Sequence, residues 1–163
     1  MTPSSGHARS AAELIAALTL FSSTCLPAET PQAHVHNMAH SVMPFDMSRT
    51  VHAFRMTETG GVQSVTAKDP GDSGQVTLIR QHLQHEAEMF ERGDYSDPAS
   101  LHGAGMPGLQ EIQAGAALIR VSYATLPAGA QLTFETTDLH LLTAIHRWFG
   151  AQLSEHGGDA KAE

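Results

Sequence analysis

Two pairs of short segments along the chain alternate between apolar and polar residues, which is the pattern of half-buried β-strands. Residues 50–56 and 62–67 form the first pair, and a Gly-Gly turn separates them. Residues 118–124 and 131–136 form the second pair, with a turn at 126–130 between them. The sequence therefore predicts two β-hairpins.

A segment with helical periodicity follows each predicted hairpin. In residues 76–92 an apolar residue recurs at helical spacing, as expected for a helix that buries one face: Val76, Ile79, Leu83, Ala87 and Phe90. Residues 139–155 show the same periodicity, and Asp138 is placed to cap that helix. Between the two repeats, residues 94–108 are predicted as a loop and residues 109–114 as a short helix. The element order is ββα, connector, ββα.

This order predicts an α+β fold in which a four-stranded antiparallel sheet carries both long helices on one face. The two halves align at the same helical turn, with Val76–Ile79 over Leu142–Ile145, which suggests a pseudo-twofold axis. The expected organisation is a signal peptide, a His/Met-rich segment without periodicity, one α+β domain and a short tail, at residues 1–28, 29–48, 49–158 and 159–163.

The first 28 residues are typical of an export signal. Their apolar run, Ala11–Phe21, is too short to span a bilayer, which needs ~20 residues, and a cleavage site is expected after Ala28. The expected location is periplasmic or secreted, with no membrane attachment after cleavage. A short buried helix remains the alternative because Glu13 interrupts the run. Lipidation of Cys25 is disfavoured because no Leu stands three residues before it.

The amino-acid composition excludes several classes of function and partner. A chain of 163 residues with 41% hydrophobic residues has one domain's length and enough apolar surface for a core. The net charge of −8 disfavours nucleic acids and anionic membranes as partners, since both attract basic patches. A single Cys excludes a disulfide scaffold. The counts of 11 His and 7 Met are the unusual features.

Histidine and methionine residues are clustered at three places in the sequence, and such clusters are candidate transition-metal sites. Imidazole binds Cu, Zn, Ni and Fe, and thioether sulfur binds Cu(I). Residues 34–47 hold His34, His36, His40, Met38, Met43 and Met47. His82, His85 and Glu86 share one flank of the first long helix, and His102 and Met106 flank a glycine-rich turn. The alternatives are a disordered tail for the first group, a solvated flank for the second and a structural turn with a core Met106 for the third.

On the last helix, His146 lies at the edge of the apolar face, and His156 falls near that face just beyond the helix end. A histidine at a core edge is often a hydrogen-bonded structural residue, and that alternative stays open for His146. His146 could also be a metal ligand, whereas His156 could fold back toward the core.

These patterns predict a periplasmic metal-binding protein, with copper as the expected ion and a role as chaperone, buffer or sensor. The expected ligands are His40, Met43, His52, His82, His85, His102, Met106 and His146. Zinc and non-covalent haem are the alternative cofactors. The alternative function is a metal-dependent enzyme whose histidines leave one coordination position open, with Glu86 as general base. A structural or interaction module is the third option, and the sequence leaves a homodimer open.

The chain also resembles a family of small exported bacterial proteins that often carry the name aspartate carbamoyltransferase. The resemblance covers nearly all of the chain after the signal, through residues 40–46, 60–62, 102–109 and 146–157. It implies a coherent fold and export. The true enzyme resembles two α/β domains with a Ser-Thr-Arg-Thr element, of which this shorter chain has only the faint echo Ser48–Thr50, so that reaction is not expected.

Overall fold

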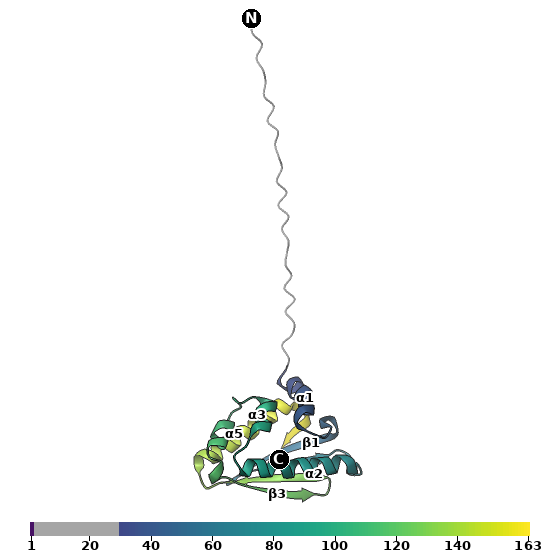
Figure 1. Ribbon diagram of the computed structural model, residues 1–163, viewed down its shortest axis with the longest axis vertical. Helices are drawn as coiled ribbons and strands as arrows, with labels where there is room; N and C mark the ends of the chain where they lie inside the picture. Colours follow the sequence, from purple (N-terminus) through teal and green to yellow (C-terminus); the bar gives the residue numbers. More distant parts are fainter. Residues whose placement is uncertain (2–29) are drawn as a thin grey trace.

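The computed structural model describes residue 1 and residues 30–163, and its core is a five-stranded sheet in the order β3-β4-β2-β1-β5 (Figure 1). The strands are β1 (Thr50–Thr57), β2 (Gly60–Ala67), β3 (Arg120–Leu126), β4 (Gly129–Glu135) and β5 (Ala160–Ala162). β1 to β4 pair antiparallel as predicted, whereas β5 pairs parallel with β1. The α+β class is confirmed, and the expectation of four strands in a purely antiparallel sheet is corrected by β5.

β5 forms because the chain turns sharply after the last helix. Gly157 has a φ of +54°, a left-handed conformation that glycine adopts without a steric penalty, and a short 3-10 turn, η3 (Gly157–Asp159), follows it. The turn brings Ala160 beside His52 in β1, and the Glu163 N–H donates to the Phe54 carbonyl at 3.1 Å. A strand of three residues has too little alternation to be predicted from sequence.

The two predicted hairpins join through their second strands, since β2 pairs with β4. Gln63 of β2 lies opposite Leu132 of β4, and the outer strands β1 and β3 flank this central pair. α2 contacts mainly β3 and β4, whereas α5 contacts β1, β2 and β5.

Both long helices, α2 (Ser73–Glu91) and α5 (Leu139–His156), pack on the same face of the sheet. Asp72 caps α2 through the Gln75 N–H, and Asp138 caps α5 through the N–H groups of residues 140 and 141. Their apolar stripes meet the aromatic residues of the strands in edge-to-face contacts, with Phe54 against Phe149 and Phe134 against Trp148. The prediction of helices on one face is confirmed.

The segment predicted as a loop before β1 contains a helix, α1 (Pro31–Val42). Thr30 caps it by accepting the Ala33 N–H, and Pro31 stands at its start, where a missing N–H costs nothing. Val35 and Ala39 bury its inner face in a small hydrophobic cluster with Met47 and Leu101 that is separate from the main core. The stripe is short and surrounded by histidines, so its helical period is hidden in the sequence.

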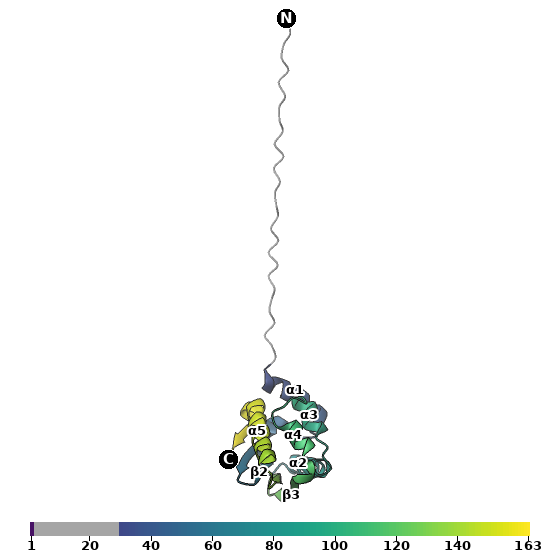
Figure 2. The same ribbon diagram turned by 90° about the vertical axis from the view of Figure 1, so that its left-hand side faces the viewer.

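The connector between the repeats holds α3 (Ser96–His102) and α4 (Leu109–Ala114), with short 3-10 turns at η1 (Met47–Arg49) and η2 (Ala116–Leu118). α4 is confirmed at its predicted bounds, whereas α3 lies in the stretch predicted as a loop. α1 and α3 lie side by side next to the C-terminal half of α5 (Figures 1 and 2). This packing places the end of α3 between α1 and α5.

The predicted signal peptide lies outside the described residues, apart from Met1. In the part of the chain that the structure describes, no helix combines the length and apolar character needed to cross a membrane.

Candidate metal centre

A cavity of about 40 Å³ lies between the sheet, α2, α3 and α5, and the C-terminal end of α1 also lines it. Its lining is rich in polar side chains: His52, Gln63, His82, Glu86, Asp97, His102, Gln152 and His156. A site needs roughly 10–15 Å³ to hold one water molecule, so the cavity has room for an ion together with a water.

Three histidines from three different elements come together in the cavity wall. The imidazole rings of His52 and His156 stack with centroids 4.9 Å apart, and those of His102 and His156 are 5.1 Å apart. His52 and His156 are 2% and 1% exposed, and the His102 side chain is 2% exposed. Histidine is rarely so buried without a polar partner, which marks this cluster as unusual.

Each of the three positions follows from local structure. His52 lies two residues before Phe54 on β1 and therefore shares the inward face of the sheet. His102 ends α3, and His156 ends α5 immediately before the Gly157 turn. The ends of two helices thus meet one strand at a single point.

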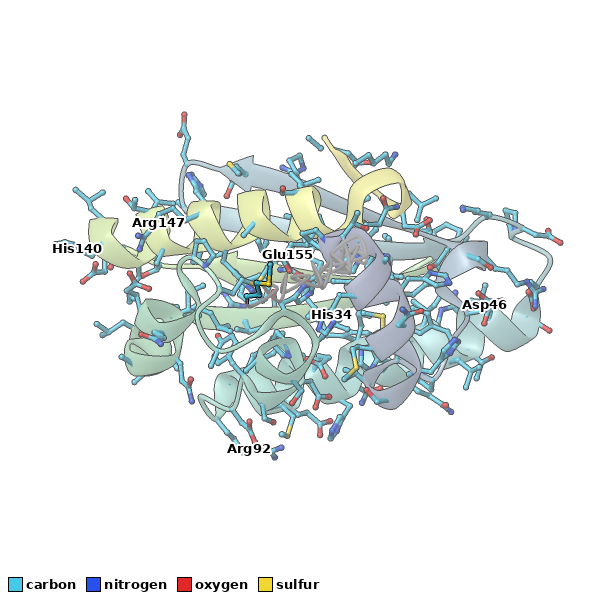
Figure 3. The ribbon with its side chains drawn as sticks, turned by 90° about the horizontal axis from the view of Figure 1, so that it is seen from above. His34, Asp46, Arg92, His140, Arg147 and Glu155 are labelled. Atoms are coloured by element: carbon cyan, nitrogen blue, oxygen red, sulfur yellow. The ribbon has the colours of Figure 1, made fainter. Side chains whose placement is uncertain are left out.

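The His102 ring is oriented by a carboxylate. Its Nδ1 lies 2.7 Å from Oε2 of Glu155, so the Nδ1–H donates to that oxygen, which leaves Nε2 as the ring nitrogen without a proton. Glu155 comes from α5, beside the α1 helix that carries His34 (Figure 3). A carboxylate behind an imidazole is the usual outer-shell support of a metal-ligating histidine, because it fixes both tautomer and ring orientation.

Several buried polar atoms around the cavity have no hydrogen-bond partner within the described residues. They are Nδ1 of His52, Nδ1 of His156, Oε1 of Glu86, Nε2 of Gln152 and Nε1 of Trp148, and all five residues line the cavity. Leaving one such atom unpaired costs about 1–3 kcal/mol. The concentration of unpaired atoms around one cavity indicates a polar occupant.

The histidines of the cavity are neutral at neutral pH. Burial, together with the charges of His82 and His102, lowers the pKa of His52 to about 4. Burial also lowers the pKa of His82 to about 4, although Asp97 opposes the shift. The pKa values of His102 and His156 are lowered by burial as well, against the opposing effect of Glu155 on His102. Only a neutral imidazole binds a metal ion, so these rings are in the ligating form.

A carboxyl pair lies in the same wall as His82. Burial, a hydrogen bond with Asp97 and the charges of Asp97 and Asp94 together raise the pKa of Glu86 to about 8. Glu86 is therefore protonated at neutral pH and serves as a hydrogen-bond donor there.

The structure brings four of the predicted ligands to the cavity: Met43, His52, His82 and His102. It places the other four elsewhere. His40 and His85 are exposed on α1 and α2, and Met106 is buried in the main core. Nε2 of His146 donates to the carbonyls of Thr57 and Gly60 at 3.0 and 2.9 Å, so this ring ties α5 to the first hairpin.

His156 and Gln152 line the cavity but are absent from the predicted ligands. Both belong to the inner face of α5, since Gln152 follows Trp148 by one turn and His156 follows Gln152 by another. This spacing was the available signal, and it places polar side chains on an otherwise apolar face. Asp97 had no such signal, because its helix was not predicted.

Among residues 30–163, no group of three or more His, Cys, Asp or Glu side chains already has the geometry to hold a metal ion. Coordination by His52, His102 and His156 therefore requires their rings to rotate out of the stacked arrangement. Comparison with protein-family models, with curated proteins and with solved structures finds no match to this chain.

Proposed function

We propose that this protein binds a transition metal ion in the buried cavity and that copper is the ion it handles, as a chaperone, buffer or sensor after export. One observation carries the proposal. Three neutral, buried imidazoles converge on one cavity, two of them with a partnerless Nδ1 among the described residues and the third oriented by Glu155. An ion in the cavity would give these nitrogen atoms the partner that they lack.

Met43 favours copper over zinc in this proposal. It lines the cavity together with the histidines and supplies a soft thioether sulfur. Thioether sulfur binds Cu(I) well and adds little to Zn(II), whereas imidazole binds both ions. Zinc could use the same three imidazoles, so the contribution of Met43 distinguishes the two metals.

The size of the cavity favours an ion over haem. About 40 Å³ accommodates an ion and a water, and a porphyrin macrocycle is many times larger. A metal-dependent enzyme remains the second candidate because the protonated Glu86 faces the same cavity and would supply a proton to a bound molecule.

Competition with a chromophoric chelator tests the metal site on the full chain. We expect His102→Gln, His156→Gln and the outer-shell variant Glu155→Gln each to weaken Cu(I) binding, with a loss of about 10- to 100-fold for Glu155→Gln. His85→Gln removes an exposed histidine from α2 and should bind like the parent protein. Unchanged affinity in the three cavity variants, with circular dichroism showing native folding, would overturn the proposal.

A pair of methionine variants tests the choice of metal. Met43→Leu removes the cavity sulfur and should weaken Cu(I) binding while leaving Zn(II) binding unchanged. Met106→Leu removes a sulfur from the main core with little change in volume, so both affinities should stay the same. Equal Cu(I) affinity in both variants would argue for zinc or for a site without sulfur.

A further inference from the structure

The histidines of α1 lie on two different sides of the helix. Val35 and Ala39 face inward, and His36 and His40 follow them by one position each, so both lie on the same outer flank. Both histidines are exposed, in contrast to the histidines of the cavity. They are four residues apart, and such neighbours on a helix have Cβ atoms about 5–6 Å apart.

Two imidazoles at this spacing can hold one ion between them. The ion needs no folding change to bind, because the helix backbone fixes the separation of the rings and their side chains are exposed to solvent. Imidazole suits copper in either oxidation state and other borderline ions, and water completes the coordination at an exposed site.

The same flank leads to the cavity. Met43 follows His40 by three residues, at the C-terminal end of α1, where its side chain lines the cavity beside Val42. Met43 is therefore about one helical turn beyond His40 and is itself part of the cavity wall. α1 buries Val35 and Ala39 in the small cluster, whereas Met43 at its end packs against both this cluster and the main core.

We propose that His36 and His40 form an outer copper site on α1, from which the ion passes Met43 into the cavity without a change of oxidation state. The outer site stands on the geometry of α1 alone. Its loading role rests on the proposed function of the cavity.

The first experiment counts Cu(I) bound to the full chain at saturation under anaerobic conditions. We expect His40→Ala to lose one equivalent relative to the parent protein. The double variant His40→Ala/Ser41→His keeps the number of histidines on α1 but places them five residues apart, on different sides of the helix, and should lose the same equivalent. His140→Ala, which removes an exposed histidine from α5, should lose none.

The second experiment measures how fast the cavity takes Cu(I) from a chelator. We expect His40→Ala to slow this uptake several-fold while the final affinity of the cavity stays the same. Full stoichiometry in His40→Ala would overturn the outer site, and an unchanged uptake rate after loss of the equivalent would overturn the loading role. Failure of the cavity proposal is separately visible, because His102→Gln would then bind as much Cu(I) as the parent protein.

Discussion

Glu86 offers a direct test of the electrostatics inside the cavity. It is 6% exposed, its Oε1 lacks a hydrogen-bond partner among the described residues, and it shares a hydrogen bond with Asp97. Burial and these neighbours raise its pKa from 4.5 to about 8. The Glu86→Gln variant keeps the shape and the hydrogen-bond donor of the protonated acid but cannot ionise.

The expected magnitude follows from the difference in proton binding between folded and unfolded chains. Between pH 4.5 and 8 the unfolded chain has lost the Glu86 proton, whereas the folded chain retains it. Stability therefore falls as the pH rises through this window, by about 1.4 kcal/mol per pH unit, and the fall levels off above the folded pKa. Glu86→Gln is neutral in both states and lacks this contribution to the fall.

Urea unfolding at pH 6.5, 7.0, 7.5 and 8.0 measures the effect. The free energy of unfolding of the parent protein should fall by about 1.6 kcal/mol more than that of Glu86→Gln across this range. Glu88→Gln, which removes an exposed carboxylate from the same helix, should behave like the parent protein. Parallel curves for the parent protein and Glu86→Gln would show that the Glu86 carboxyl is ionised in the folded state and that our description of the cavity is wrong.

Three further predictions concern stability. The folded pKa of His52 is about 4, so below pH 6.5 the unfolded chain binds a proton that the folded chain does not. Stability should therefore fall as the pH drops from 6.5 to 4, by up to about 3 kcal/mol from this residue. Acid titration followed by circular dichroism should show a smaller fall in His52→Gln. His146→Ala should lower the free energy of unfolding by about 1–3 kcal/mol, because two hairpin carbonyls lose their donor, and it should leave Cu(I) affinity unchanged in chelator competition. Gly108→Ala should lower the melting temperature, because a Cβ there would lie 2.1 Å from the Ala144 carbonyl oxygen at a φ of +86°, whereas a Cβ at Gly105 would meet nothing within 4 Å and Gly105→Ala should change little.

The hairpins and the long helices were predictable because each buries one face over several periods. Residues 76–92 repeat their apolar positions across the whole of α2, and the alternation of residues 50–56 persists through most of β1. α1 and β5 lack this length of signal. α1 buries only Val35 and Ala39 among its residues, and β5 is ordered by a turn at Gly157 rather than by any pattern of its own.

The candidate site was only partly predictable, for a different reason. Residue type indicated imidazole and thioether chemistry, but tertiary packing decided which side chains meet. His82 and His85 are one turn apart on α2, yet His82 lines the cavity and His85 is exposed. Met106 has the same chemistry as Met43 but belongs to the main core. Spacing along one element cannot distinguish such pairs, because the neighbouring element determines which flank is covered.

The position of the cavity explains how this fold can maintain so many polar groups in its interior. The main core is formed by aromatic and aliphatic side chains between the sheet and the long helices, and some of them, such as Leu83, Phe90 and Trp148, also line the cavity. The histidines lie at the margin of this core, where the ends of α3 and α5 meet β1. Nδ1 of His52 and Nδ1 of His156 have no partner among the described residues, so each lowers stability at this margin. A cavity at such a margin is also within reach of the surface through α1, which is what a site that loads and releases an ion requires.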